Sequence, residues 1–151
     1  RVVRAFELLD EGTSYAQQHR QLQALPQYYP AYQFGLQVTP QLLRERIDDR
    51  VDQMIADGLV GEVESLLSRG LREALTAQQA IGYKEIVGYL DGAFSLDEAI
   101  EQIKTATHRY AKRQRTWFNH DKRIVCLQAD EFNVEQLVDD IVAKLGRRSD
   151  A

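Results

Sequence analysis

The sequence has little of what marks a secreted, zinc-binding or membrane-spanning protein. Its 151 residues include a single cysteine, Cys126, so the chain can form neither an internal disulfide nor a zinc site built from several cysteines. No apolar run approaches the roughly 20 residues of a membrane-spanning helix, and the first residues do not follow the pattern of a signal peptide. We therefore expect a cytoplasmic protein that does not contact a membrane.

An excess of positive charge is also lacking. The chain has 19 Lys and Arg residues against 23 Asp and Glu residues, which gives a net charge of −4 and a pI of about 5.4. This balance excludes a protein that binds nucleic acid over its whole surface, so a site for a polyanion has to be local. With 44% hydrophobic and 28% charged residues, the composition is that of a globular chain, long enough to bury a core in one domain.

Positive charge is concentrated in one stretch, "THRYAKRQRTWF" (107–118), which contains no acidic residue. On a helical wheel, one side is predicted to pack on the protein and contains Ile103, Ala106, Thr107, Tyr110, Gln114 and Trp117. The other positions are predicted to present five cations outward: Lys104, Arg109, Lys112, Arg113 and Arg115. Guanidinium groups match phosphate oxygens, and nearby aromatic rings stack on unpaired bases, so the pattern favours an RNA site. A solvated charged helix face is the alternative.

A pair of arginines lies in the earlier segment "LLRERIDDRVDQM", where Arg46 and Arg50 are one helical turn apart. The wheel places Arg50 at the edge of a buried stripe, beside Leu43 and Met54, with Arg46 just outside it. An unpaired buried charge costs several kcal/mol, so an arginine in this position requires an anion. A carboxylate of the protein and a phosphate of a substrate are both open interpretations.

Helical patterns and their stop residues divide the chain. Ser95 and Glu98 form a predicted capping box at the start of the basic helix, and Thr39 with Pro40 is a predicted N-cap followed by a first helical residue. Residues 13–30 are polar and Gln-rich, and the two prolines of their closing segment "LPQYYP" (25–30) predict a connector. The expected helices cover 1–11, 40–57, 59–69, 80–90, a long segment that starts after Ser95, and 133–146.

Two segments, 31–38 and 123–129, have the β-branched and aromatic composition of strands. Because an isolated pair of strands makes a poor sheet, we expect them to join a sheet whose other strands lie outside this sequence. The chain also opens at Arg1 inside a helical pattern, without a cap before it. Both features predict a fragment of a larger protein.

Four segments in this order resemble the C-terminal part of the tRNA dimethylallyltransferases, also called tRNA isopentenyltransferases. They are "RVVRAFELLDEG", "LLRERIDDRVDQMIADGLVGEVESLL", "QAIGYKEIVGYLDG" and "THRYAKRQRTWF". The resemblance covers about residues 1–120, and "AIGYKE" and "YAKRQ-TWF" are its most specific parts. It implies an α/β fold in which this predominantly helical chain contributes two strands to a P-loop NTPase-like parallel sheet. Residues 1–30 would end the helical insertion domain and form a connector, and 31–151 would be the C-terminal part of the catalytic core.

The resemblance further implies an activity: transfer of a dimethylallyl group from dimethylallyl diphosphate to N6 of adenosine 37, beside the anticodon of a tRNA. The expected partners are the tRNA anticodon stem-loop and dimethylallyl diphosphate, with Mg²⁺ as cofactor, in an enzyme that is monomeric at full length. By resemblance Arg46 and Arg50 contact the diphosphate, and Arg50 takes a catalytic role by stabilising the leaving group. The residues implied in tRNA binding are Arg1, Arg4, Gln79, Ile81, Gly82, Tyr83, Lys84, Arg109, Lys112, Arg113, Gln114 and Arg115.

Two parts of the family's apparatus are missing from these residues. There is no Gly-rich phosphate loop with its Lys-Ser/Thr pair, and no segment matches the acidic general base. We expect both to lie upstream of Arg1, so that the chain alone is inactive. The histidines have no metal-site spacing, and only His108 is a candidate for contact with a phosphate. The alternatives are a non-catalytic helical RNA-binding module and an adaptor whose basic face meets an acidic protein.

Overall fold

The computed structural model describes residues 2–24, 29, 31–131 and 133–149. It separates into two units, Arg1–Tyr32 and Gln33–Ala151. In the described part of the chain, no helix combines the length and the apolar composition needed to cross a membrane.

The first unit contains two helices, α1 (Val2–Asp10) and α2 (Tyr15–Ala24). The predicted first helix is confirmed, and it ends before Gly12, whose φ of +78° is strained for other residues. The segment 13–30, where no helix is predicted, contains α2. The connector predicted from the prolines of 25–30 falls almost entirely outside the described residues. Helix α2 has good helix formers but no apolar stripe, and Ser14 Oγ caps it by accepting a hydrogen bond from Gln17 N (3.2 Å).

The second unit contains a sheet of two parallel strands, β1 (Gln33–Gln37) and β2 (Ile124–Gln128). Their register runs from Gln33 opposite Ile124 to Gln37 opposite Gln128. The last helix, α7 (Val134–Ser149), packs against the strands through buried Leu127, Ala129 and Leu137. Both predicted strands and the final helix are therefore confirmed.

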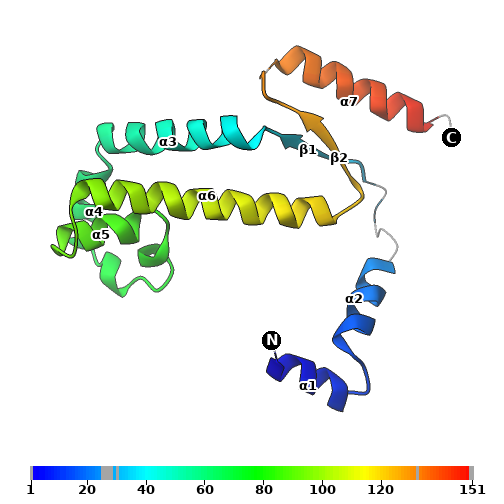
Figure 1. Ribbon diagram of the computed structural model, residues 1–151, viewed down its shortest axis with the longest axis horizontal. Coiled ribbons are helices and arrows are strands. Elements are labelled where there is room, and N and C mark those ends of the chain that lie inside the picture. Colours follow the sequence, from blue (N-terminus) through cyan, green and yellow to red (C-terminus); the bar gives the residue numbers. More distant parts are fainter. Residues whose placement is uncertain (1, 25–28, 30, 132, 150–151) are drawn as a thin grey trace. The chain divides into compact units, whose positions relative to one another are not determined.

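Four helices connect the two strands: α3 (Pro40–Ala56), α4 (Leu59–Leu67), α5 (Tyr83–Leu90) and α6 (Leu96–His120). Figure 1 shows α3 and α6 side by side, running in opposite directions between the sheet and the end that holds α4 and α5. The predicted helix over 80–90 begins later, at Tyr83, because two short 3₁₀ turns, Leu71–Glu73 and Ala77–Gln79, precede it.

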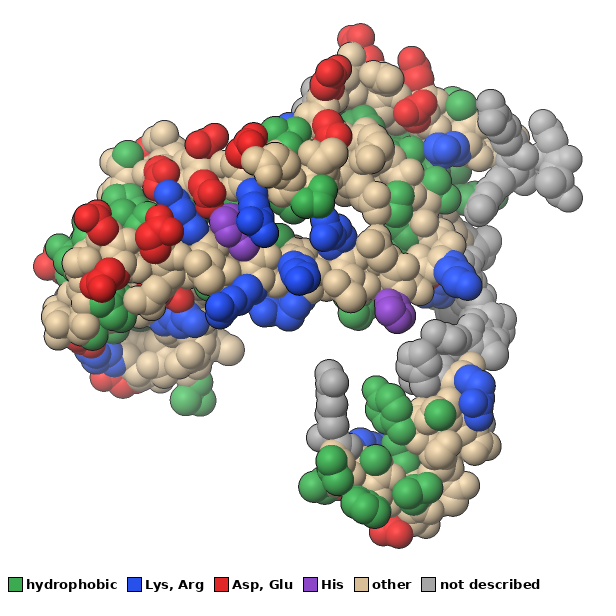
Figure 2. All heavy atoms as spheres, viewed as in Figure 1, with side chains coloured by type: hydrophobic (Ala, Val, Ile, Leu, Met, Phe, Trp, Pro, Cys, Tyr) green, Lys and Arg blue, Asp and Glu red, His purple; other side chains and the backbone are tan. Residues whose placement is uncertain are grey.

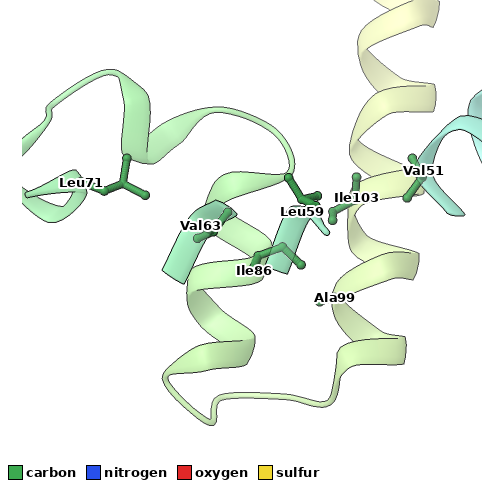
Figure 3. Packing of buried hydrophobic residues seen from close by; sticks show 7 residues of the cluster. All are labelled: Val51, Leu59, Val63, Leu71, Ile86, Ala99 and Ile103. Atoms are coloured by element: carbon green, nitrogen blue, oxygen red, sulfur yellow. The ribbon is translucent and has the colours of Figure 1, made fainter. Parts of the chain in front are cut away.

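The main core lies where these four helices meet (Figure 3). Its members are Val51, Leu59, Val63, Leu71, Ile86, Ala99 and Ile103. Val51 comes from α3 and Ile103 from α6, so the core fixes the two long helices against each other at the end remote from the sheet. This packing determines which side chains of α3 and α6 face one another.

Of the two predicted helix starts, one is confirmed in full. Ser95 Oγ accepts a hydrogen bond from Glu98 N (3.2 Å), and the Glu98 carboxylate accepts one from Ser95 N (2.8 Å), as in a capping box. At α3 the first helical residue is Pro40 as predicted, but the Thr39 side chain makes no capping bond. Instead Thr39 N donates to Asp130 Oδ1 (2.6 Å), because the parallel pairing brings the end of β2 next to the end of β1.

Two helical glycines are expected to respond in opposite ways to alanine. A Cβ at Gly88 in α5 would lie 2.4 Å from Phe94 Cζ, whereas a Cβ at Gly61 in α4 would meet no atom within 4 Å. We expect Gly88→Ala to lower the free energy of unfolding by about 1–3 kcal/mol. Gly61→Ala should raise it by about 0.5–1 kcal/mol through helix propensity. Urea unfolding checks both, and an equal gain in both variants would contradict the close packing at Gly88.

Candidate nucleic-acid interface

The basic segment (107–118) occupies the half of α6 that extends beyond the main core toward β2. The predicted packing side is confirmed only at its start, where Ile103 is buried and Ala106 and Thr107 are half-buried. Beyond them the prediction is wrong: Tyr110 is 47% exposed, Trp117 is 70% exposed, and Gln114 is also exposed. The helix is longer than the core it packs on, so in the described residues little covers this side.

The exposed aromatic side chains are held in defined contacts. The Trp117 and Phe118 rings meet edge to face, with centroids 4.9 Å apart. The Arg113 guanidinium lies 5.7 Å from the centroid of the Tyr110 ring. Exposed rings next to cations are suited to stacking on bases that have left a helix.

Four of the five predicted outward cations are exposed: Arg109, Lys112, Arg113 and Arg115. None of them forms an ion pair with a carboxylate among the residues that the structure describes. Their charge is therefore available to an external anion.

Lys104 is the exception, and its prediction as an outward cation is wrong. Its Nζ lies 2.7 Å from Asp52 Oδ1 of α3, and only 16% of its side chain is exposed. The hydrogen bond to Asp52 raises the pKa of Lys104. This partner could not be predicted from positions along α6, because Asp52 comes from another helix; Glu101, three positions before Lys104, adds only a weaker attraction.

A groove of about 170 Å³ lies between α3 and the basic segment. Its lining consists of Pro40, Leu43, Arg44, Ile47, His108, Arg109, Ala111, Lys112 and Arg115. Apolar side chains thus alternate with cations, and no acidic side chain contributes to the lining. Figure 2 shows the corresponding gathering of Lys and Arg side chains, with a histidine among them.

Sequence reasoning missed Arg44 as a member of this surface. Nothing in the local pattern distinguishes it from other exposed arginines, except that it lies three residues before the half-buried Ile47. Only the packing of α3 on α6 brings it opposite Lys112.

His108 contacts a carboxylate of its own chain. Its Nε2 lies 2.9 Å from Asp48 Oδ1, and both atoms are buried, but the angle is outside that of a hydrogen bond. The attraction therefore depends on the protonated form of the histidine. Asp48 faces His108, and Asp52 faces Lys104, so neither of these carboxylates pairs with Arg50.

The two arginines implied in diphosphate binding lie outside the groove. Arg46 Nη2 donates a hydrogen bond to the carbonyl oxygen of Asp130 (2.8 Å), which ties the guanidinium to the end of β2. Arg50 is exposed and has no partner among the described residues. The prediction that Arg50 is half-buried is wrong, because the side of α3 beside the core stripe is left uncovered. Its charge is nevertheless free for a ligand.

The remaining residues implied in tRNA binding surround the start of α5. Gly82 has a φ of +99° and precedes the helix, with Gln79 and Ile81 exposed before it. Gly82 N donates to the buried Glu85 carboxylate (2.8 Å), and Lys84 Nζ lies 3.3 Å from the same group. The Tyr83 hydroxyl donates to Glu62, and this bond raises the pKa of Tyr83. Lys84 is thus 47% exposed but partly neutralised.

In the first unit, Arg4 forms ion pairs with Glu7 (3.1 Å) on its own helix and with Glu11 (3.7 Å) directly after it. Arg1 lies outside the described residues. No group of three or more His, Cys, Asp or Glu side chains that could hold a metal ion occurs in the described part of the chain.

Comparison with known proteins gives consistent matches. The family model described as IPP transferase matches residues 1–121. The tRNA dimethylallyltransferase of Carboxydothermus hydrogenoformans is 44% identical over 149 residues, which cover 97% of this chain and 47% of that protein. The enzyme of the same name from Geobacillus thermodenitrificans is 50% identical over 121 residues, covering 80% and 38%.

A solved structure of the tRNA delta(2)-isopentenylpyrophosphate transferase of Staphylococcus epidermidis aligns with a TM-score of 0.76 and 32% identity. The alignment covers 97% of this chain and 48% of that one. The chain spans about half the length of the curated relatives that it matches. The sequence, the order of its motifs and the fold agree, and the chain belongs to the IPP transferase family.

Proposed function

We propose that this chain works as part of a tRNA dimethylallyltransferase. The reaction breaks the C1–O bond of dimethylallyl diphosphate and forms a bond from C1 to N6 of adenosine 37. The diphosphate leaves, and N6 loses a proton. The observation that carries the proposal is the family match over residues 1–121 together with relatives of that name at 44–50% identity.

In this proposal Arg46 and Arg50 bind the diphosphate. Negative charge grows on the diphosphate as the C1–O bond weakens, and a guanidinium placed there stabilises the transition state more than the ground state. Arg50 has no internal partner to give up, which supports this role. We propose that Mg²⁺ enters with the diphosphate, because proteins usually bind this ion through one or two carboxylates together with substrate phosphates.

The proposed role of the basic segment is to hold the anticodon stem-loop. Its unpaired cations attract the phosphates, and Tyr110 and Trp117 offer exposed rings to bases that leave the stack. Holding the loop offsets the cost of extruding adenosine 37, which is a few kcal/mol. The residues at the start of α5, with Arg1 and Arg4, are proposed as further tRNA contacts.

For the fold, we propose that β1 and β2 complete a P-loop NTPase-like parallel sheet. Parallel sheets occur almost only in larger, covered assemblies, and Leu36 on β1 is 55% exposed here. The first unit would then end the insertion domain, and the second would be the C-terminal part of the core. We further propose that the complete enzyme is monomeric and acts in the cytoplasm, where its proposed substrate is found.

The chain alone is expected to bind RNA without transferring a prenyl group. The test incubates residues 1–151 with an anticodon stem-loop and dimethylallyl diphosphate, and measures both RNA affinity and product. Affinity for the stem-loop without product fits the proposed division of roles, because the phosphate loop and the base are not in this sequence. Product formation would contradict that division, and absence of RNA binding would contradict the proposed interface.

A further inference from the structure

The groove between α3 and α6 is lined by cations from both helices and not only by those of the basic segment. Arg44 of α3 lines one wall, and Arg109, Lys112 and Arg115 of α6 line the other. These side chains approach from two helices whose positions are fixed by the main core. A ligand in the groove would therefore meet cations on both sides rather than on one helix face.

No negative charge lines this groove. Two acids of the neighbouring segments are engaged elsewhere: Asp48 lies against His108, and Asp130 accepts a hydrogen bond from Thr39 N. Arg44 has no hydrogen bond or ion pair among the residues that the structure describes. Cations held close together without a counter-ion repel one another, so an anion between them is favoured.

The N-terminal end of α3 also borders the groove. Pro40 is the first residue of α3 and lines the groove, there is no acidic residue in the first turn, and the Thr39 side chain does not cap the helix. The Asp130 carboxylate, which accepts the hydrogen bond from Thr39 N, lies at this end of the helix and offsets part of its positive dipole, so the charge of the groove comes mainly from the side chains. Leu43, Ile47 and Ala111 form an apolar floor, which suits a ligand with a sugar beside its charge.

We propose that this groove binds a phosphodiester of the RNA, and that Arg44 is a further RNA-binding residue. The proposal rests on the proposed function, because it assigns one more contact to the same RNA. A single phosphodiester bridging the two helices accepts hydrogen bonds from Arg44 on one side and from Lys112 or Arg109 on the other. Specificity for a phosphate follows from the guanidinium fork and the absence of competing carboxylates.

The experiment measures binding of an anticodon stem-loop to the full 151-residue chain over a range of salt concentrations. We expect Arg44→Ala to weaken RNA binding about tenfold, the loss of one hydrogen bond to a charged group, and to reduce the salt slope by about 0.7–0.9. Arg69→Ala is the matched control, because Arg69 is an exposed arginine without an ion pair that does not line the groove. It changes the net charge equally and should have little effect.

Two further measurements test whether Arg44 and Lys112 hold the same phosphate and whether that phosphate belongs to the RNA. In the double variant Arg44→Ala/Lys112→Ala, the loss of affinity should be smaller than the product of the two single losses if both side chains hold one phosphate. Inorganic pyrophosphate, titrated into the chain, tests the other phosphate source. Loss of pyrophosphate binding in Arg44→Ala with unchanged RNA affinity would overturn the proposal. Equal effects of Arg44→Ala and Arg69→Ala on RNA affinity would also overturn the proposal. If Arg109→Ala still weakened RNA binding in that case, the proposed function would be unaffected.

Discussion

Replacement of Arg50 by alanine in the complete enzyme is expected to slow prenyl transfer by about 10²–10³-fold while leaving tRNA affinity unchanged. This is the size of effect seen when one donor that stabilises developing negative charge is removed. Arg50 is exposed and unpaired, so its removal leaves no buried carboxylate without a partner. The loss would then arise in the reaction and not in the fold. Single-turnover kinetics with saturating tRNA measure it.

Two variants serve as controls for Arg50→Ala. Arg50→Lys keeps the charge but loses the bidentate fork, so it should recover part of the rate. Arg69→Ala removes an equally exposed arginine from another part of the second unit and should be neutral. If Arg50→Ala weakened tRNA binding as much as it slowed transfer, Arg50 would belong to the RNA surface.

Neutralisation of the basic segment should produce the second large effect. Replacing Arg109, Lys112 and Arg113 together by glutamine removes three exposed cations that pair with no carboxylate among the described residues. We expect the affinity for the stem-loop to fall about 100-fold at physiological salt, and the slope of log K against log salt to become shallower by ~2–3. Binding titrations at several salt concentrations measure both quantities.

Lys104→Gln is the matched control on the same helix. Its ammonium group already pairs with Asp52 at 2.7 Å and is mostly covered, so its removal should leave the salt slope almost unchanged. A triple variant with the slope of the unmodified protein would mean that the basic segment is only a solvated helix face. In that case the remaining candidates for RNA contact would be the residues around Lys84, together with Arg1, Arg4 and Arg44.

Local sequence signals predicted most of the helices and strands. The sequence predicted the capping box at Ser95 and Glu98 and the helix ends at glycines. These signals involve residues only a few positions apart, so they do not depend on the tertiary fold. The helix α2 was missed because it has no apolar stripe, which is the feature that periodicity detects.

The candidate site was less predictable, because its geometry depends on contacts between helices. A helical wheel gives the direction of Arg50 but not whether a neighbouring element covers that side. It likewise cannot show that Lys104 meets Asp52, or that Arg44 lies across from Lys112, since these pairs are more than 50 residues apart. The family resemblance implied roles for single residues such as Arg109 and Lys112. It did not indicate the groove that these residues line together with Arg44.

The length of α6 has a mechanical consequence. A helix of 25 residues is about 37 Å long, so a tilt of only about 5° at the core end displaces the far end by roughly 3 Å. The hydrogen bond from Gln37 Nε2 to Asn119 Oδ1 (3.1 Å) resists such a swing at the sheet end. Substitutions at Ile86 or Gly88 in α5, at the core end, are therefore expected to displace the basic segment at the other end of α6.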